Sequence, residues 1–259
     1  MTVPLNFNGF IRRRFRAVCP VFLIPVMLVL AGFQPAYGAE TLTIAAGAGY
    51  RRPITELAAA FERTSGIRVA SFFGNMGQVF AQAGQSDQVA VVFGDQAFLQ
   101  RADTVRFGRM LDAGRGRLVL AWPKGRRLNR VEDIDAADVG RIAMPDARHA
   151  IYGKAAAEFL EHSGLIGKVA DRLLTVATVP QVSAYLVSGE VDAGFINLTD
   201  ALGVKERIGG FIEIDPSLYG EIRIVGGVVE GREALPGVSA FGVFLDTAEA
   251  RAILGRHGL

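Results

Sequence analysis

The sequence is poor in the residues that most often carry catalysis or fix a fold covalently. Its 259 residues include one cysteine, one tryptophan and three histidines. The cysteine, Cys19, lies in an N-terminal stretch that we expect to be removed, so we expect neither a disulfide nor a cysteine metal site in the rest of the chain. Gly-x-Ser-x-Gly and His-Glu-x-x-His segments are also missing. The common nucleophilic and zinc-dependent hydrolase motifs are therefore excluded.

An excess of charge of one sign is also lacking. The chain has 28 Lys and Arg against 26 Asp and Glu, and 50% of its residues are hydrophobic. Four of the arginines fall within residues 1–39, which hold no acidic residue, so 24 basic and 26 acidic residues remain after them. This balance does not predict a nucleic-acid surface, and the composition is typical of a globular protein rather than a disordered one.

Residues 1–39 have the three-part pattern of a cleaved signal peptide. A basic stretch at 12–16 precedes an apolar run at 17–33, and small residues follow at 36–39. The run is about 17 residues long and contains two prolines, which places it at the lower limit for a spanning helix. We expect export to the periplasm, with the secretion route open and a membrane anchor as the alternative. No later stretch is long and apolar enough to span a bilayer.

From residue 41 onwards, short β-branched runs alternate with helical patterns, which is typical of strands joined by crossover helices. We predict an α/β fold of two lobes joined by a hinge, each lobe a mostly parallel sheet flanked by helices. Residues 40–120 and 222–259 are expected to form the first lobe, and residues 121–221 the second. The expected strands are 41–46, 67–73, 89–93, 117–122, 141–143, 174–177 and 193–196, with a strand pair near 221–229. The main expected helices are 54–64, 151–163, 180–187 and 247–257.

Two of the predicted strands lead into glycine-bearing turns, Gly47-Ala48-Gly49 and Gly74-Asn75-Met76-Gly77. Turns at the carboxyl ends of neighbouring parallel strands meet at one edge of the sheet, where the next helices point their N–H groups. Glycine also permits backbone conformations that turn several N–H groups toward one point. We therefore predict an anion site in the gap between the lobes. Tight turns without a ligand are the alternative, and a dinucleotide site is disfavoured because Arg52 occupies the third glycine position.

A few charged residues allow other interpretations. Asp95, Asp146 and His149 follow strand ends and could serve an exported enzyme in the same cleft, although capping of helices is the expected role of the two carboxylates. Arg51 and Arg52 could draw an anion toward the cleft or form a solvated face. A ligand-sensing module of a regulator is a further alternative, but no DNA-binding or signalling segment is present.

The order of several motifs resembles the periplasmic molybdate-binding proteins of ABC importers, within the larger class of extracytoplasmic solute-binding proteins. The resemblance covers essentially all of residues 40–259. It rests on Phe61-Glu-x-x-x-Gly66-Ile-x-Val69, Phe73-Gly-x-x-Gly77, Leu118-Val-Leu-Ala-x-Pro-Lys-Gly125, Ile142-Ala-x-Pro145 and Gly189-Glu190-x-Asp-Ala-Gly194. It implies a periplasmic-binding-protein-like (type II) fold that closes over a tetrahedral oxyanion.

The resemblance also implies the residues at the ligand, and here the sequence departs from the family. The family uses serine hydroxyls from two strand ends, a tyrosine hydroxyl and backbone amides. The resemblance places Ala48 at the first serine, Asn75 or Met76 at the second, and Asn197 at the tyrosine. The predicted ligand-binding residues are Gly47, Ala48, Gly49, Tyr50, Asn75, Met76, Ala150, Tyr152, Val179 and Asn197. Replacement donors would be the Asn75 and Asn197 amides, the tyrosine hydroxyls and main-chain N–H groups.

The sequence thus predicts a monomeric, exported receptor without enzymatic activity or a cofactor. Its expected partners are an oxyanion, with molybdate or tungstate leading, and the permease subunits of an ABC importer in the inner membrane. A receptor for another small anion or an organic acid is the alternative.

Overall fold

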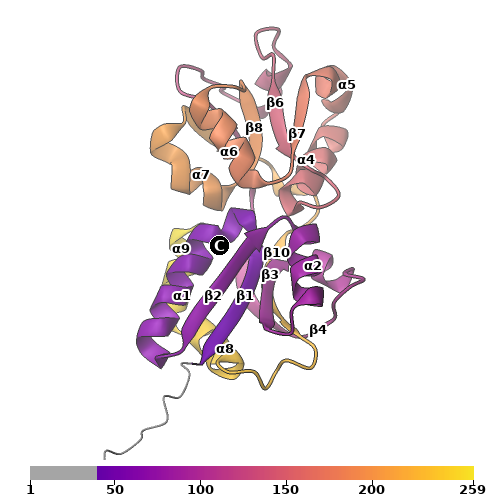
Figure 1. Cartoon of the computed structure of the whole chain (residues 1–259). Helices are drawn as coiled ribbons and strands as arrows, with labels where there is room; N and C mark the ends of the chain where they lie inside the picture. Colours follow the sequence, from indigo (N-terminus) through magenta and orange to yellow (C-terminus); the bar gives the residue numbers. More distant parts are fainter. Residues whose placement is uncertain (1–39) are drawn as a thin grey trace, which may run out of the picture. The chain divides into compact units, whose positions relative to one another are not determined.

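The computed structural model describes residues 40–259, and the predicted signal peptide at 1–39 lies outside this range. The described residues form two α/β lobes, each built on a 5-stranded sheet (Figure 1). The strand order is β2-β1-β3-β10-β4 in the first sheet and β7-β6-β8-β5-β9 in the second. The predicted two-lobe α/β fold is confirmed. No helix within residues 40–259 is long and apolar enough to cross a membrane.

The first lobe combines the N-terminal part of the described chain with its C-terminal end. Its strands are β1 (Thr41–Gly47), β2 (Arg68–Gly74), β3 (Val89–Asp95), β4 (Phe107–Arg115) and β10 (Arg223–Val229). Its helices are α1 (Arg51–Ser65), α2 (Met76–Gln85), α3 (Gln96–Gln100), α8 (Val238–Leu245) and α9 (Ala248–Arg256), and a short 3-10 turn, η1 (Ala48–Tyr50), joins β1 to α1.

The second lobe is the continuous segment of the chain between β4 and β10. Its strands are β5 (Leu118–Trp122), β6 (Ile142–Pro145), β7 (Leu173–Val176), β8 (Ala193–Asn197) and β9 (Gly210–Glu213). Its helices are α4 (Ile151–His162), α5 (Ile166–Val169), α6 (Val179–Ser188) and α7 (Leu198–Val204). Short 3-10 turns lie at Val131–Asp135, Ala170–Arg172, Lys205–Arg207 and Pro216–Leu218.

Local sequence explains where the helices start and stop. Helix α1 carries Pro53 in its first turn, where a missing N–H costs nothing, and ends at Gly66, whose φ of 73° is the left-handed conformation that glycine adopts readily. Its buried residues include Leu57 and Phe61, one turn apart on the face that packs against the sheet. These features confirm the helix that the apolar spacing predicts.

Each sheet is mixed. Strand β1 pairs in parallel with β2 and β3, whereas β10 runs antiparallel to β3 and β4. In the second sheet β6 pairs in parallel with β7 and β8, and β5 runs antiparallel to β8 and β9. The region near 221–229 was predicted as a strand pair, but it forms the single strand β10. Its antiparallel partner β4 was not predicted, because this largely exposed segment lacks an apolar alternation.

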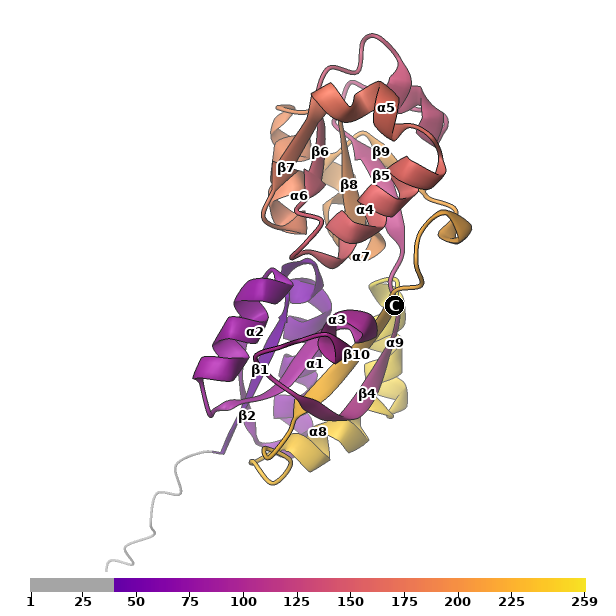
Figure 2. The same ribbon diagram turned by 90° about the vertical axis from the view of Figure 1, so that its right-hand side faces the viewer.

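The chain passes between the lobes twice. It leaves the first sheet after Arg115 and enters the second at Leu118, and it returns into β10 at Arg223. The two crossings run side by side (Figure 2), and the Gly116 N–H donates to the Ile222 carbonyl at 2.9 Å. A main-chain hydrogen bond thus joins the two crossings directly.

Candidate functional site

A small cavity lies between the lobes, where β1 and β2 end and where helices α4 and α6 begin. Its volume is about 310 Å³, part of which is open to solvent. This volume is at the small end of the range for ligand pockets. The lining residues are Gly47, Ala48, Gly49, Tyr50, Gly74, Asn75, Met76, Ala150, Ile151, Tyr152, Thr178 and Val179. The cavity is therefore suited to a small solute.

Helical segments of both lobes begin at this cavity. In the first lobe, η1 leads into α1 and Asn75 caps α2; in the second, Ala150 precedes α4 and Thr178 caps α6. The first N–H groups of a helix have no acceptor within their own helix, and the peptide dipoles add partial positive charge at that end. Four such ends around one small cavity favour a negatively charged guest.

Some of these N–H groups are already engaged. The Met76 N–H donates to the His149 carbonyl at 2.8 Å, which links the lobes, and the Ala150 N–H donates to the Asp146 carbonyl at 2.9 Å. Ala150 was predicted to offer its N–H to a ligand, but in this arrangement that group is satisfied internally. Four other N–H groups of the cavity lining have no hydrogen-bond acceptor within residues 40–259. They belong to Gly49, Ile151, Tyr152 and Val179. These N–H groups could donate to a bound anion.

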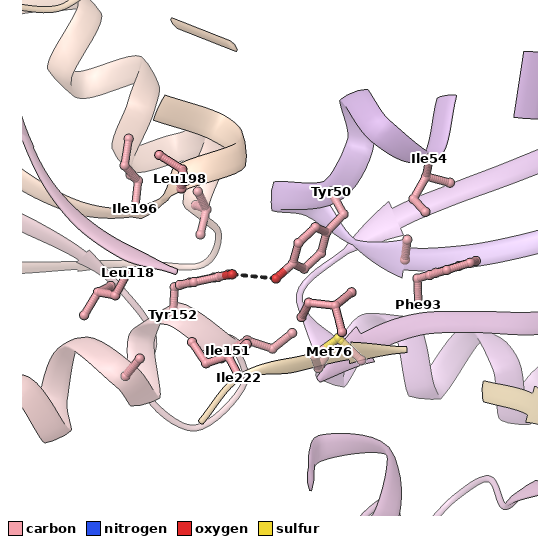
Figure 3. Close-up of a cluster of buried hydrophobic side chains, with 14 of the residues drawn as sticks. Tyr50, Ile54, Met76, Phe93, Leu118, Ile151, Tyr152, Ile196, Leu198 and Ile222 are labelled. Atoms are coloured by element: carbon pink, nitrogen blue, oxygen red, sulfur yellow. Dashed lines mark hydrogen bonds between the residues drawn. The ribbon is translucent and has the colours of Figure 1, made fainter. Parts of the chain in front are cut away.

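Tyr50 and Tyr152 face each other from opposite lobes (Figure 3). Their hydroxyl oxygens are 2.6 Å apart, and both residues are buried. Burial raises the pKa of both phenols above the ordinary value, with the neighbouring hydroxyl acting as a further influence on each. A pair of hydroxyls uses one proton for its mutual hydrogen bond and keeps the other. One neutral O–H donor therefore remains for a guest.

No Lys, Arg or His side chain is among the described residues that line the cavity. Arg51 instead stacks on the ring of Phe73, with its guanidinium carbon 4.3 Å from the ring centre. Arg52 forms an ion pair with the buried Asp200 of the second lobe. The charge of an anion in this cavity would therefore be met by N–H and O–H dipoles alone.

The four glycines of the predicted turns serve a purpose different from the one expected. None of the four has a positive φ, the conformation in which other residues are strained, and Gly47 has a φ of −54°. Two of them instead allow close approach: a Cβ on Gly49 would lie 3.0 Å from the Asn197 amide nitrogen, and one on Gly74 would lie 2.7 Å from the Gln78 side-chain oxygen. Gly77 lies outside the cavity lining, against the ring of His149.

Two amide side chains were predicted as ligand donors, and they have different environments. Asn75 lines the cavity; its Oδ1 accepts from the Gln78 N–H at 3.0 Å as part of a capping box, which leaves its NH₂ group as a donor. Asn197 is fully buried and outside the lining. Its Nδ2 donates to the Gly49 carbonyl at 3.1 Å and its Oδ1 accepts from the Asp200 N–H at 3.2 Å. Its amide is therefore occupied by protein groups.

The residues of the enzyme alternative do not gather at the cavity. Asp95 caps α3, as expected, and also accepts from the Arg223 N–H at 3.0 Å. Asp146 accepts from the N–H groups of Arg148 and His149 and from the His149 ring, so it closes a turn rather than capping a helix. Although partial burial acts against it, these hydrogen bonds hold the pKa of Asp146 below its ordinary value. Asp95, Asp146 and His149 are all absent from the lining.

Three lining residues, Gly74, Ile151 and Thr178, are not in the predicted ligand-binding set, although Gly74 belongs to one of the two predicted turns. Ile151 and Thr178 both lie at helix starts. Thr178 could have been found, because Thr178-x-x-Gln181 is a capping-box pattern at the start of a predicted helix, and the structure contains that box. Ile151 carries no polar side chain, so only the geometry of its main chain identifies it.

A small cavity between two lobes, lined by N–H and O–H donors of both, is typical of a binding protein for a small solute. The chain matches the family model of the bacterial extracellular solute-binding proteins over residues 42–259, and it belongs to this family.

Individual relatives are more distant. The chain is 26% identical to the molybdate-binding protein ModA of Rhodobacter capsulatus, over 89% of this chain and 92% of that protein. It superposes on the periplasmic molybdate-binding protein of Azotobacter vinelandii with a TM-score of 0.76 at 23% identity, covering 84% of this chain and 97% of that one. PEB3 of Campylobacter jejuni with L-phospholactate bound gives a TM-score of 0.67 at 16% identity, over 84% and 98% of the two chains. The predicted resemblance to the molybdate-binding proteins is confirmed.

Proposed function

We propose that this protein is the exported receptor of an ABC importer, and that it binds a small tetrahedral oxyanion, molybdate or tungstate, between its lobes for delivery to a membrane permease. The observation that carries the proposal is the convergence of four helical N-terminal ends on one small cavity without a cationic side chain. Family membership and the molybdate-binding relatives support the receptor role.

The donor set favours an anion that carries no proton. Every polar group that we assign to the ligand donates: the N–H groups of Gly49, Ile151, Tyr152 and Val179, the Asn75 NH₂ group and one tyrosine hydroxyl. A protonated oxyanion would bring its own O–H against these donors and leave it without an acceptor, which costs about 1–3 kcal/mol. Molybdate and tungstate are preferred to phosphate on this ground, and the molybdate-binding relatives favour them over sulfate.

The test is calorimetric titration of ligand-stripped protein with molybdate, tungstate, sulfate and phosphate. We expect binding of the first two, and a loss of about 1–3 kcal/mol of binding free energy in Asn75→Ala if the amide donates to the ligand. Asn129→Ala, on an exposed turn of the second lobe away from the cavity, is the matched control. Absence of heat with all four anions would contradict the proposed ligand class.

A small organic acid is the second candidate. Met76, Ile151 and Val179 give the cavity apolar walls, and a solved protein with the same fold holds L-phospholactate. Titration with phospholactate and short carboxylates in the same calorimeter distinguishes this candidate from the inorganic oxyanions.

A further inference from the structure

Beside the cavity, the start of helix α7 in the second lobe packs against the Ala48–Tyr50 turn and the start of α1 in the first lobe. Two polar contacts cross between the lobes here: Asn197 Nδ2 donates to the Gly49 carbonyl at 3.1 Å, and Arg52 pairs with Asp200. We call this group of residues, Gly49, Arg52, Ser183, Asn197 and Asp200, the α7 latch.

The second-lobe half of the latch is held together by its own hydrogen bonds. Asn197 Oδ1 accepts from the Asp200 N–H at 3.2 Å, and the Ser183 hydroxyl donates to the Asp200 carboxylate. Asn197, Ser183 and Asp200 are all buried. Buried polar groups that satisfy one another are held in one geometry, so the Asn197 NH₂ group and the free side of the Asp200 carboxylate are aimed at the first lobe.

The first-lobe half has a complementary form. A Cβ on Gly49 would come within 3.0–3.3 Å of Nδ2, Oδ1 and Cγ of Asn197, so the Asn197 amide lies directly against the Gly49 backbone. The Arg52 guanidinium lies over Gly203 of α7, where a Cβ would overlap it. Both contacts depend on positions without a side chain, and both are lost if the lobes separate.

We propose that Asn197 is a positioning residue: through the α7 latch it ties lobe closure to the placement of Gly49, whose N–H faces the cavity. The inference rests on the proposed receptor function and extends it to a residue that does not line the cavity. Since the latch contacts exist only while the lobes are together, their loss should accelerate ligand release and leave the rate of association largely unchanged.

The test compares three variants. Asn197→Ser keeps a side-chain acceptor for the Asp200 N–H but is too short to reach the Gly49 carbonyl. Arg52→Met removes the ion pair across the lobes. Arg51→Met is the matched control, because the neighbouring Arg51 stacks on Phe73 within its own lobe. Thermal unfolding checks that each variant folds.

Two measurements are made on each protein. The first is the dissociation rate of molybdate by stopped flow, expected to rise about tenfold in Asn197→Ser and Arg52→Met and to stay unchanged in Arg51→Met. The second is the distance between spin labels on cysteines at the exposed positions Gln85 and Glu161, one in each lobe, with and without molybdate. We expect longer distances in the two latch variants.

The proposal would be overturned if the two latch variants had the same molybdate dissociation rates and the same spin-label distances as Arg51→Met. If the wild-type protein bound none of the four anions, the proposed ligand class would be wrong. In that case the ligand-free distances decide the latch: lengthening in both latch variants supports it, and unchanged distances overturn it.

Discussion

At the scale of single residues, the contact between Tyr50 and Tyr152 sets the chemistry of the cavity. Each hydroxyl comes from a different lobe, and each is buried. The pair offers a neutral donor in place of the serine hydroxyls that the resembling family uses, and both tyrosines belong to the predicted replacement donors. Because burial raises the pKa of both phenols, neither ionises in the neutral range, and the donor is retained across it.

Tyr152→Phe tests this pair. The change removes one hydroxyl and leaves Tyr50 with a buried hydroxyl that has lost its partner, so we expect a loss of about 1–2 kcal/mol in unfolding free energy and a roughly tenfold weaker ligand affinity. Urea denaturation and calorimetry measure the two effects. Tyr185→Phe, on the partly exposed surface of α6, is the control. Equal affinities in the two variants would contradict a role for the hydroxyl pair.

The same phenols predict a dependence of stability on alkaline pH. A raised pKa means that the folded state keeps a proton that the unfolded state loses near pH 10. The stabilisation is therefore complete below the ordinary tyrosine pKa and is lost as the pH rises above it. We expect the wild-type protein to lose more unfolding free energy than Tyr152→Phe between about pH 9 and pH 11. Denaturant titrations at several pH values in this range compare the two slopes.

At the scale of elements, Asp95 joins three segments of the first lobe. It ends β3, caps α3 through the N–H groups of Ala97 and Phe98, at 3.1 and 3.2 Å, and accepts from the Arg223 N–H at the start of β10. Burial raises its pKa despite these three hydrogen bonds. Its position at a strand end, which made it a candidate for chemistry, is explained by this structural role.

Asp95→Ala should therefore lower stability and leave ligand binding intact. The loss of a cap and of the acceptor for the Arg223 N–H predicts about 2–3 kcal/mol less unfolding free energy. Asp215→Ala, which removes an exposed cap from a short 3-10 turn, should cost less than about 1 kcal/mol. Denaturation and calorimetry on both variants check this. Loss of binding in a stable Asp95→Ala protein would point to a role in the site after all.

At the scale of residues 40–259 as a whole, two chain crossings join the lobes that line the cavity. Gly116 lies in the first crossing, bonded to the second through the Ile222 carbonyl. A Cβ there would overlap the Tyr152 hydroxyl and come within 2.7 Å of the Ile222 side chain. The Gly116 backbone, in the first crossing, is therefore packed directly against Tyr152, which lines the cavity.

Gly116→Ala should lower both the stability of the protein and its affinity for the ligand. We expect about 1–3 kcal/mol less unfolding free energy from the overlap, and weaker ligand binding because Tyr152 must move. Gly167→Ala is the matched control, since an added Cβ in that α5 position meets nothing within 4 Å. If the two alanine variants proved equally stable and bound ligand equally well, the packing of the hinge against Tyr152 would be irrelevant to function.

Much of the fold could be predicted because its signals are local. The face of α1 follows from the spacing of Leu57 and Phe61, and its end follows from Gly66. The turns after β1 and β2 were placed at the ligand gap because parallel strands end at one edge. Strand β4 was missed, since its strand conformation depends on pairing with β10, more than a hundred residues later in the chain.

The candidate site divides in the same way. The sequence by itself placed the turns that contain Gly47 and Asn75 at one edge of the sheet, because strand direction fixes the edge at which parallel strands end. Only the tertiary structure decided which groups remain free there. Asn197 donates to the Gly49 carbonyl and Tyr50 meets Tyr152, because hydrogen-bond partners distant in sequence are set by how two lobes pack. That packing is a property of the folded chain as a whole and leaves no periodic signal in any one segment.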